Sequence, residues 1–136
     1  MRRVARDRDL KTSFKFCFDQ ARGNVKTLER IFVTFDSKSG FSSNGMLGGF
    51  ADELESKTSV FQSAAEIDSA LICVSQKVLS HQIAMYNWLV CWASAMGFYA
   101  ESRMLSKILD QKEVSARELS AIAHDICQQI SQIAAA

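Results

Sequence analysis

The fold of this chain is decided by residues 67–96, which read IDSALICVSQKVLSHQIAMYNWLVCWASAM. Apolar side chains recur there every three or four positions, which is the spacing of one face of an α-helix. Gly97 follows directly, and glycine is the residue most often found just beyond a helix end. At about 1.5 Å per residue this helix would be roughly 45 Å long. We therefore expect one long helix from Ile67 to Met96.

Two further long helices and one short helix are predicted around it. One long helix runs from about Phe98 to Ile133, and the very short connection to the preceding helix requires the two to be antiparallel. Another runs from Leu10 to about Phe35, followed by a segment rich in loop-forming residues at 36–44. The short helix is marked by Met46, Phe50 and Leu54.

Apolar stripes at helical spacing identify the faces of the two flanking helices. In the N-terminal helix the stripe is interspersed with Lys, Arg and Glu on the remaining surface. It comprises Phe14, Phe18, Ala21, Val25, Leu28 and Phe32. The predicted inner face of the C-terminal helix comprises Met104, Ile108, Leu119, Ile122, Ile126 and Ile130.

The composition indicates a single all-α domain over residues 1–136. Hydrophobic residues make up 48% of the chain, enough for one core, and proline, which helix interiors exclude, does not occur. Sixteen Lys and Arg against fifteen Asp and Glu give a net charge of +1. This balance does not favour binding to nucleic acid or to an anionic membrane surface.

No segment predicts export or membrane insertion. No stretch approaches about 18 uninterrupted apolar residues, and no apolar signal-peptide core follows the basic N-terminus. The cysteines are dispersed, without the spacing of a zinc site or a disulfide framework. These features favour a cytoplasmic protein whose cysteines are reduced and buried. The cysteines are Cys17, Cys73, Cys91 and Cys127.

Several segments together resemble a known family. They are residues 10–14 and 23–32, then 45–48, then 68–86 with their Asp-Ser-Ala-Leu-Ile and Gln-Lys-Val motifs, and then 109–123. In order and spacing they are similar to the YciF-like (YciE/YciF) stress-response proteins. The resemblance implies a ferritin-like antiparallel helical bundle.

The residues at the metal positions that this resemblance implies depart from the family. A ferritin-like di-metal site takes a Glu from each of two helices and Glu-x-x-His pairs from the others. Where the family has His-Leu-Glu-Glu-Thr, residues 17–21 read CFDQA. Its Glu-His-Tyr-Glu is LSHQ at 79–82, its Leu-Glu-Glu-Glu-Lys-Ala-Thr-Asp is LDQKEVSA at 109–116, and its Met-Glu-Gly carboxylate is Leu47.

Amides and apolar side chains bind hard cations weakly or not at all, so we expect neither a metal nor another cofactor. The altered positions are Cys17, Gln20, Leu47, Leu79, Ser80, Gln82, Gln111 and Ala116. Three nearby polar residues, Asp19, His81 and Asp110, are displaced by one or two positions from those of the family's ligands. Such a displacement turns a helical side chain by about 100° to 200°, which favours boundary or surface positions.

Other residues are candidates for an interface or a ligand wall. His81 and Gln82 interrupt an apolar stripe without an acidic partner one turn away, which favours a hydrogen-bonded pair in the core or at its rim. Trp88 and Trp92 lie one turn apart, which favours packing in the core or at an interface over a ligand-binding wall. Phe16 lies off the apolar stripe of its helix, so that helix is apolar on more than one side. No catalytic triad or phosphate loop can be assembled, and we expect no enzymatic activity.

The resembled family also has a long N-terminal helix that this chain does not match. Residues 1–9 are expected to be a flexible basic N-terminus or the remnant of that lost helix, unless Met1 is an internal start. The remaining helices would expose apolar faces, which mark protein contacts. We expect these faces to be closed by a second copy or by a different protein, with no membrane span.

The predicted function is therefore that of a non-catalytic structural or interaction protein within a homo- or hetero-oligomer. Two alternatives are a small-molecule binder that uses the bundle interior and a di-iron type stress protein.

Overall fold

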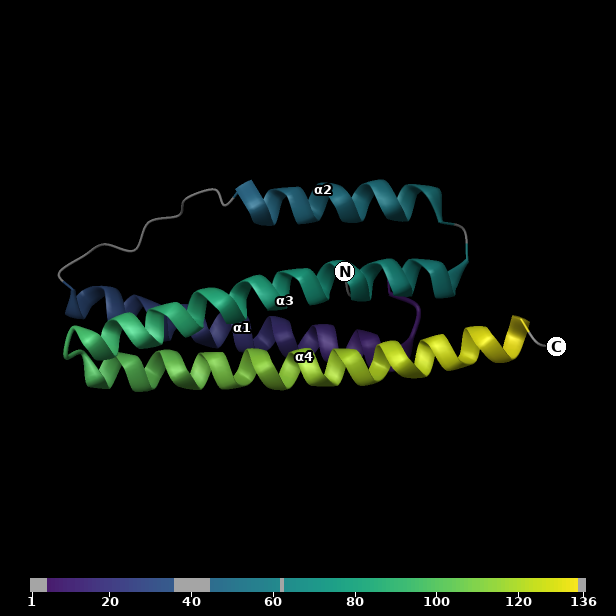
Figure 1. Ribbon diagram of the computed structural model, residues 1–136. Helices are drawn as coiled ribbons and strands as arrows, with labels where there is room; N and C mark the ends of the chain where they lie inside the picture. Colours follow the sequence, from purple (N-terminus) through teal and green to yellow (C-terminus); the bar gives the residue numbers. More distant parts are fainter. Residues whose placement is uncertain (1–4, 36–44, 62, 135–136) are drawn as a thin grey trace.

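The computed structural model describes residues 5–35, 45–61 and 63–134, and every regular element in these ranges is a helix (Figure 1). Helix α1 spans Arg8–Thr34, α2 Gly45–Val60, α3 Ala64–Ala95 and α4 Tyr99–Ala134. The predicted bundle of three long helices and one short helix is confirmed. Each end lies close to the position that the sequence predicts.

Side chains at the N-termini of α1 and α3 satisfy backbone amides that have no partner within the helix. The Asp7 carboxylate accepts a hydrogen bond from the Leu10 amide at 2.8 Å. At the start of α3 the Glu66 amide donates to the Ser63 hydroxyl, and the Glu66 carboxylate accepts from the Ser63 amide. This reciprocal arrangement is a capping box, which specifies a helix start locally.

Gly97 ends α3 and turns the chain into α4. Its φ angle is +83°, in the left-handed region that glycine adopts without a steric penalty. The Gly97 amide donates to the Ser94 carbonyl at 3.0 Å and the Phe98 amide to the Ala93 carbonyl at 2.8 Å. This pair of bonds is a Schellman motif, and it allows α4 to fold back along α3.

Replacing Gly97 with alanine is expected to lower the free energy of unfolding by about 1 kcal/mol, because a Cβ at positive φ is strained. No neighbour lies within 4 Å of the added Cβ, so the backbone angle alone causes the loss. Urea denaturation measures the effect. Gly23→Ala is the matched control, because Gly23 lies inside α1 with similar free space, and it should instead stabilise by about 0.5–1 kcal/mol. Equal effects of the two substitutions would contradict this assignment.

The long helices α1 and α3 both pack on α4, with α3 making the more extensive contact, while α2 packs on α3. Among the described residues α1 and α3 make almost no close backbone contact with each other. Figure 1 shows α2 lying along the outer side of α3, away from α4. The backbones of α1 and α3 therefore lie further from each other than either lies from α4, and side chains bridge the two helices.

The buried apolar side chains form two separate clusters. The first joins the N-terminal ends of α1 and α3 to the C-terminal half of α4. The second joins the opposite ends of the same helices through Ile31, Ala93 and Leu105. The first cluster consists of Ala5, Leu10, Leu71, Ile72, Leu79, Leu119 and Ile126.

The described part of the N-terminus is anchored to α3 and to the first cluster. Ala5 is buried in the first cluster. The amides of Arg6 and Asp7 each donate to the Asp68 carboxylate at 2.7 Å. Because Asp68 is itself buried on α3, it fixes where α1 begins relative to α3.

Three expectations about individual side chains are wrong. The fully or largely buried residues of α1 are Leu10, Ser13, Asn24 and Ile31, so α1 does not dock on α4 with its apolar stripe. Ile130 is exposed near the end of α4. Cys91 and Cys127 are exposed and the other two cysteines are half-buried, because these residues lie on the flanks of their helices rather than on the packed faces.

Candidate functional site

A layer of polar side chains separates the two apolar clusters. The Asn24 side-chain amide of α1 donates to Gln111 Oε1 of α4 at 3.0 Å. One turn away, Ser115 Oγ of α4 donates to Gln20 Oε1 of α1 at 3.4 Å. Lys112 lies between these two pairs in the sequence of α4 and is also buried. We call Gln20, Asn24, Gln111, Lys112 and Ser115 the polar layer.

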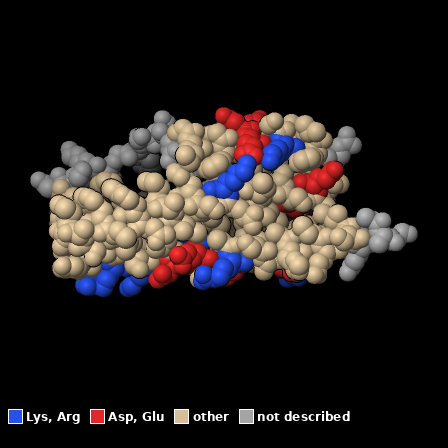
Figure 2. All heavy atoms as spheres, in the orientation of Figure 1, with Lys and Arg blue, Asp and Glu red and all other residues tan. Residues whose placement is uncertain are grey.

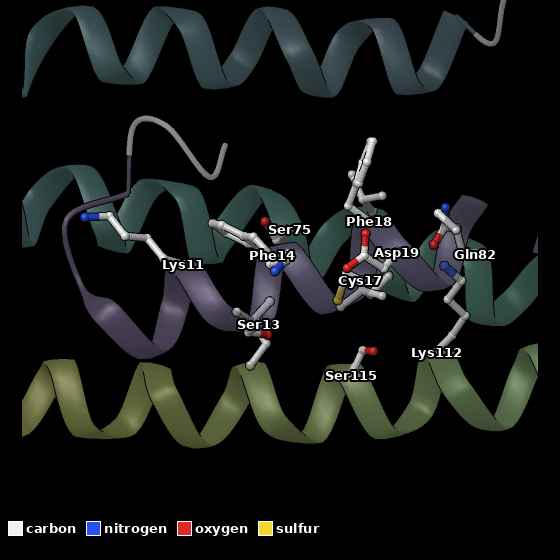
Figure 3. A pocket seen from close by; sticks show the side chains of 15 residues that line it. Lys11, Ser13, Phe14, Cys17, Phe18, Asp19, Ser75, Gln82, Lys112 and Ser115 are labelled. Atoms are coloured by element: carbon white, nitrogen blue, oxygen red, sulfur yellow. The ribbon is translucent and has the colours of Figure 1, made fainter. Parts of the chain in front are cut away.

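A groove of about 1370 Å³ opens beside this layer, between α1, α3 and α4 (Figure 3). It exceeds the about 300–1,000 Å³ of a typical ligand pocket. The residues contributed by α1 lie between Lys11 and Ala21, and those contributed by α3 between Ser75 and Gln82. The polar and charged lining residues include Lys11, Lys15, Cys17, Asp19, Gln82 and Lys112.

Lys112 is the unusual residue of the groove. Only 7% of its surface is exposed, and within the described ranges its amine forms no ion pair and no hydrogen bond. Burial lowers the pKa of Lys112 because it disfavours the charged form, and nearby Cys17 opposes this effect more weakly. In Figure 3 the side chain rises from α4 into the groove.

A second feature lies where α3 meets α4. The indoles of Trp88 and Trp92 are stacked with their ring centroids 6.3 Å apart. Trp92 also contacts Phe35 and Phe98, at centroid distances of 5.8 and 6.4 Å, and these two phenylalanines meet edge to face at 4.6 Å. Trp88 nevertheless remains 61% exposed. We call these four residues the aromatic cluster.

The structure brings together some of the altered metal positions and separates others. Cys17, Leu79 and Gln82 line the groove, and Gln20 and Gln111 form the hydrogen bonds of the polar layer. Ser80 is exposed. Ala116 packs against the first apolar cluster. The side chain of Leu47 lies outside the described residues.

The remaining candidates are dispersed. Phe16 is exposed on α1 and does not line the groove. His81 is half-buried, whereas Asp19 and Asp110 are exposed, as the sequence predicts. In the part of the chain that the structure describes, no three His, Cys, Asp or Glu side chains come together as a metal site would require.

Sequence reasoning missed Lys112 and Ser115 as residues of the bundle interior. Both lie in residues 109–116, the segment LDQKEVSA that departs from the family's Leu-Glu-Glu-Glu-Lys-Ala-Thr-Asp. The altered metal positions predicted in this segment are Gln111 and Ala116. The signal that could have found them is helical spacing. Residues on one face of a helix recur every three or four positions, and this spacing links Ile108, Lys112, Ser115 and Leu119. The first and last are buried, so the two polar residues between them share the buried face.

Comparison with known proteins identifies a family and solved structures with a similar fold. The family described as "Domain of unknown function (DUF892)" matches residues 1–132. The stress protein YciF of E. coli has a TM-score of 0.87 at 19% identity, over 93% of this chain and 80% of its own. For YcfI of Rhodopseudomonas palustris, for which a structural role has been suggested, the values are 0.83 and 20%, over 88% and 76%. No curated protein matches significantly.

At these identities the likeness to YciF and YcfI shows a shared helical-bundle fold.

Among the described helices, none has the length and apolar character needed to cross a membrane.

Proposed function

Since the chain belongs to the DUF892 family, as its resemblance to the YciF-like proteins predicts, we propose that it is a non-catalytic interaction protein acting within an oligomer. The observation that carries this proposal is the exposure of stacked Trp88 in the aromatic cluster. Burying most of one such indole would contribute on the order of 2–4 kcal/mol to binding. Tryptophans of this kind are frequent energetic centres of protein interfaces.

The surroundings of the aromatic cluster support a contact surface. Met85 is exposed on the same half of α3, Met96 is exposed at the C-cap of that helix, and Phe32 is exposed on α1. The face seen in Figure 2 is largely uncharged along this half of the molecule, apart from its lower edge. Exposed apolar patches of this kind mark interfaces in folded proteins. The structural role suggested for YcfI points in the same direction.

The polar layer supports a bundle without the family's metal chemistry. A pair of hard cations requires several carboxylate ligands. The corresponding interior of this chain offers the amides Gln20, Gln82 and Gln111 and the hydroxyl of Ser115. Lys112 adds a buried amine, whose positive charge would repel a bound cation. These residues do not fit a di-metal centre.

The Trp88→Ala substitution is expected to weaken association of the chain with itself or with its partner by about 10- to 100-fold. The bundle should remain folded because Trp88 is mostly exposed. Native mass spectrometry of the full chain, purified without chelator, gives the oligomeric state and any bound metal. Sedimentation over a range of concentrations then gives the dissociation constant.

Ile130→Ala is the matched control, because Ile130 is an exposed apolar residue near the far end of α4. It should leave association unchanged. A wild-type chain that stays monomeric and binds no hydrophobic dye would contradict the proposal. One or two transition-metal ions bound per chain would instead favour a redox protein.

A further inference from the structure

We propose that the groove between α1 and α3 binds a medium-chain carboxylic acid, with the carboxylate paired to the Lys112 ammonium and the acyl chain along the apolar wall. This site is separate from the aromatic cluster. The last residue that α3 contributes to the groove is Gln82. It lies six residues before Trp88, which corresponds to about 9 Å along the helix. The proposal therefore does not depend on the proposed oligomer.

Lys112 supplies the charge that would recognise the acid. Lys112 has its stem buried and no acidic partner among the described residues. No fully buried polar side-chain atom of the described residues lacks a partner, so the amine must keep its contact with solvent inside the groove. An ammonium that is largely shielded from water and has no counter-ion is costly, and an incoming carboxylate would supply both the charge and the hydrogen-bond acceptors.

The charge around the groove selects for an anion. Lys11 and Lys15 stand at its α1 wall together with Lys112 from α4, against the single carboxylate of Asp19 among the described lining residues. Asp19 is exposed and forms no ion pair with any of these lysines in the described structure. The groove thus carries a positive excess that attracts an acid and repels an amine.

The shape of the groove fits the tail of the acid. Most of the lining is apolar, with Phe14 and Phe18 from α1, Val78 and Leu79 from α3 and Leu119 from α4. The α1 wall from Lys11 to Ala21 is about 15 Å long. That length suits a medium-length acyl chain, and the volume of about 1370 Å³ leaves room for it. A molecule with one anionic end and an apolar tail meets both features of the groove.

The probes for the test are dodecanoate and dodecanol, which share a chain length and differ in charge. Both are titrated by calorimetry into the full-length protein, below the concentrations at which either aggregates. The wild-type chain is expected to bind dodecanoate at least about tenfold more tightly than dodecanol, since only the acid forms a charge-assisted hydrogen bond with both partners ionised.

Lys112→Met is expected to abolish this preference while leaving dodecanol binding unchanged. The variant should fold and be more stable than the wild type, because it removes an unpaired buried amine but keeps an unbranched side chain. Thermal unfolding checks this. Lys112→Gln provides a second neutral variant. Lys107→Met is the matched control, since Lys107 is an exposed lysine of α4 outside the groove, and it should keep the preference.

Three results would overturn the proposal. They are equal affinity of the wild type for dodecanoate and dodecanol, no binding of dodecanoate, and a preference for the acid that survives in both Lys112 variants. Trp88→Ala should bind dodecanoate as the wild type does. This last measurement separates the ligand site from the proposed protein interface, since either can fail while the other stands.

Discussion

Replacing Leu71 with alanine is expected to lower the free energy of unfolding by about 3 kcal/mol, within the range of about 2–5 kcal/mol for buried leucines. Leu71 is 0% exposed and belongs to the cluster that joins α1, α3 and α4. The substitution removes apolar contacts and leaves a cavity that three helix backbones prevent from closing. Against a total stability of about 5–15 kcal/mol, this is a large fraction.

Urea denaturation of wild type and variant, followed by far-ultraviolet circular dichroism, measures this loss. Val33→Ala is the control, because Val33 is 77% exposed on α1 and exposed substitutions usually change stability by less than about 0.5 kcal/mol. If the two variants unfolded at the same urea concentration, Leu71 would not be part of a packed core.

Replacing Asp68 with alanine is expected to cost about 2–4 kcal/mol, because it leaves the amides of Arg6 and Asp7 without their acceptor. The loss should also release Ala5 from the first apolar cluster. Hydrogen exchange of these two amides, measured together with urea unfolding, separates local release of the N-terminus from global destabilisation. Both amides should exchange much faster in the variant.

Asp68→Asn is a more conservative substitution at the same contact. It keeps one carbonyl oxygen, so we expect a loss smaller than that of the alanine variant. Asp125→Ala is the control, since Asp125 is exposed on α4. An Asp68→Ala variant as stable as this control, with unchanged exchange at Arg6 and Asp7, would show that the hydrogen bonds of Asp68 with these two amides contribute nothing to stability.

The choice of buried face on α1 illustrates where sequence periodicity stops being informative. The apolar stripe of α1 correctly predicts a helix, yet its residues Phe18, Val25 and Phe32 are exposed. The helix instead packs with the face of Asn24, whose amide meets Gln111 across the interface. A helix that is apolar on more than one side offers several faces for burial, and the complementary partner on α4 decides between them.

In the candidate site, the burial of Lys112 also depends on tertiary packing. In the sequence it is one of three charged residues in the segment LDQKEVSA at 109–116, and charge alone does not show which of them is buried. Its burial follows from the packing of α1 on α4. Its lack of an acidic partner is visible only when α1, α3 and α4 are in place around it.

Periodicity, the capping residues and Gly97 determine the helices and their ends, because these signals act between residues within a few positions of each other. The family follows from the order and spacing of the same segments. The anchoring of residues 5–7 by Asp68, the polar layer and the groove were decided by tertiary structure alone. Each depends on residues more than 60 positions apart in the sequence, and such pairings are set by how whole helix faces fit together.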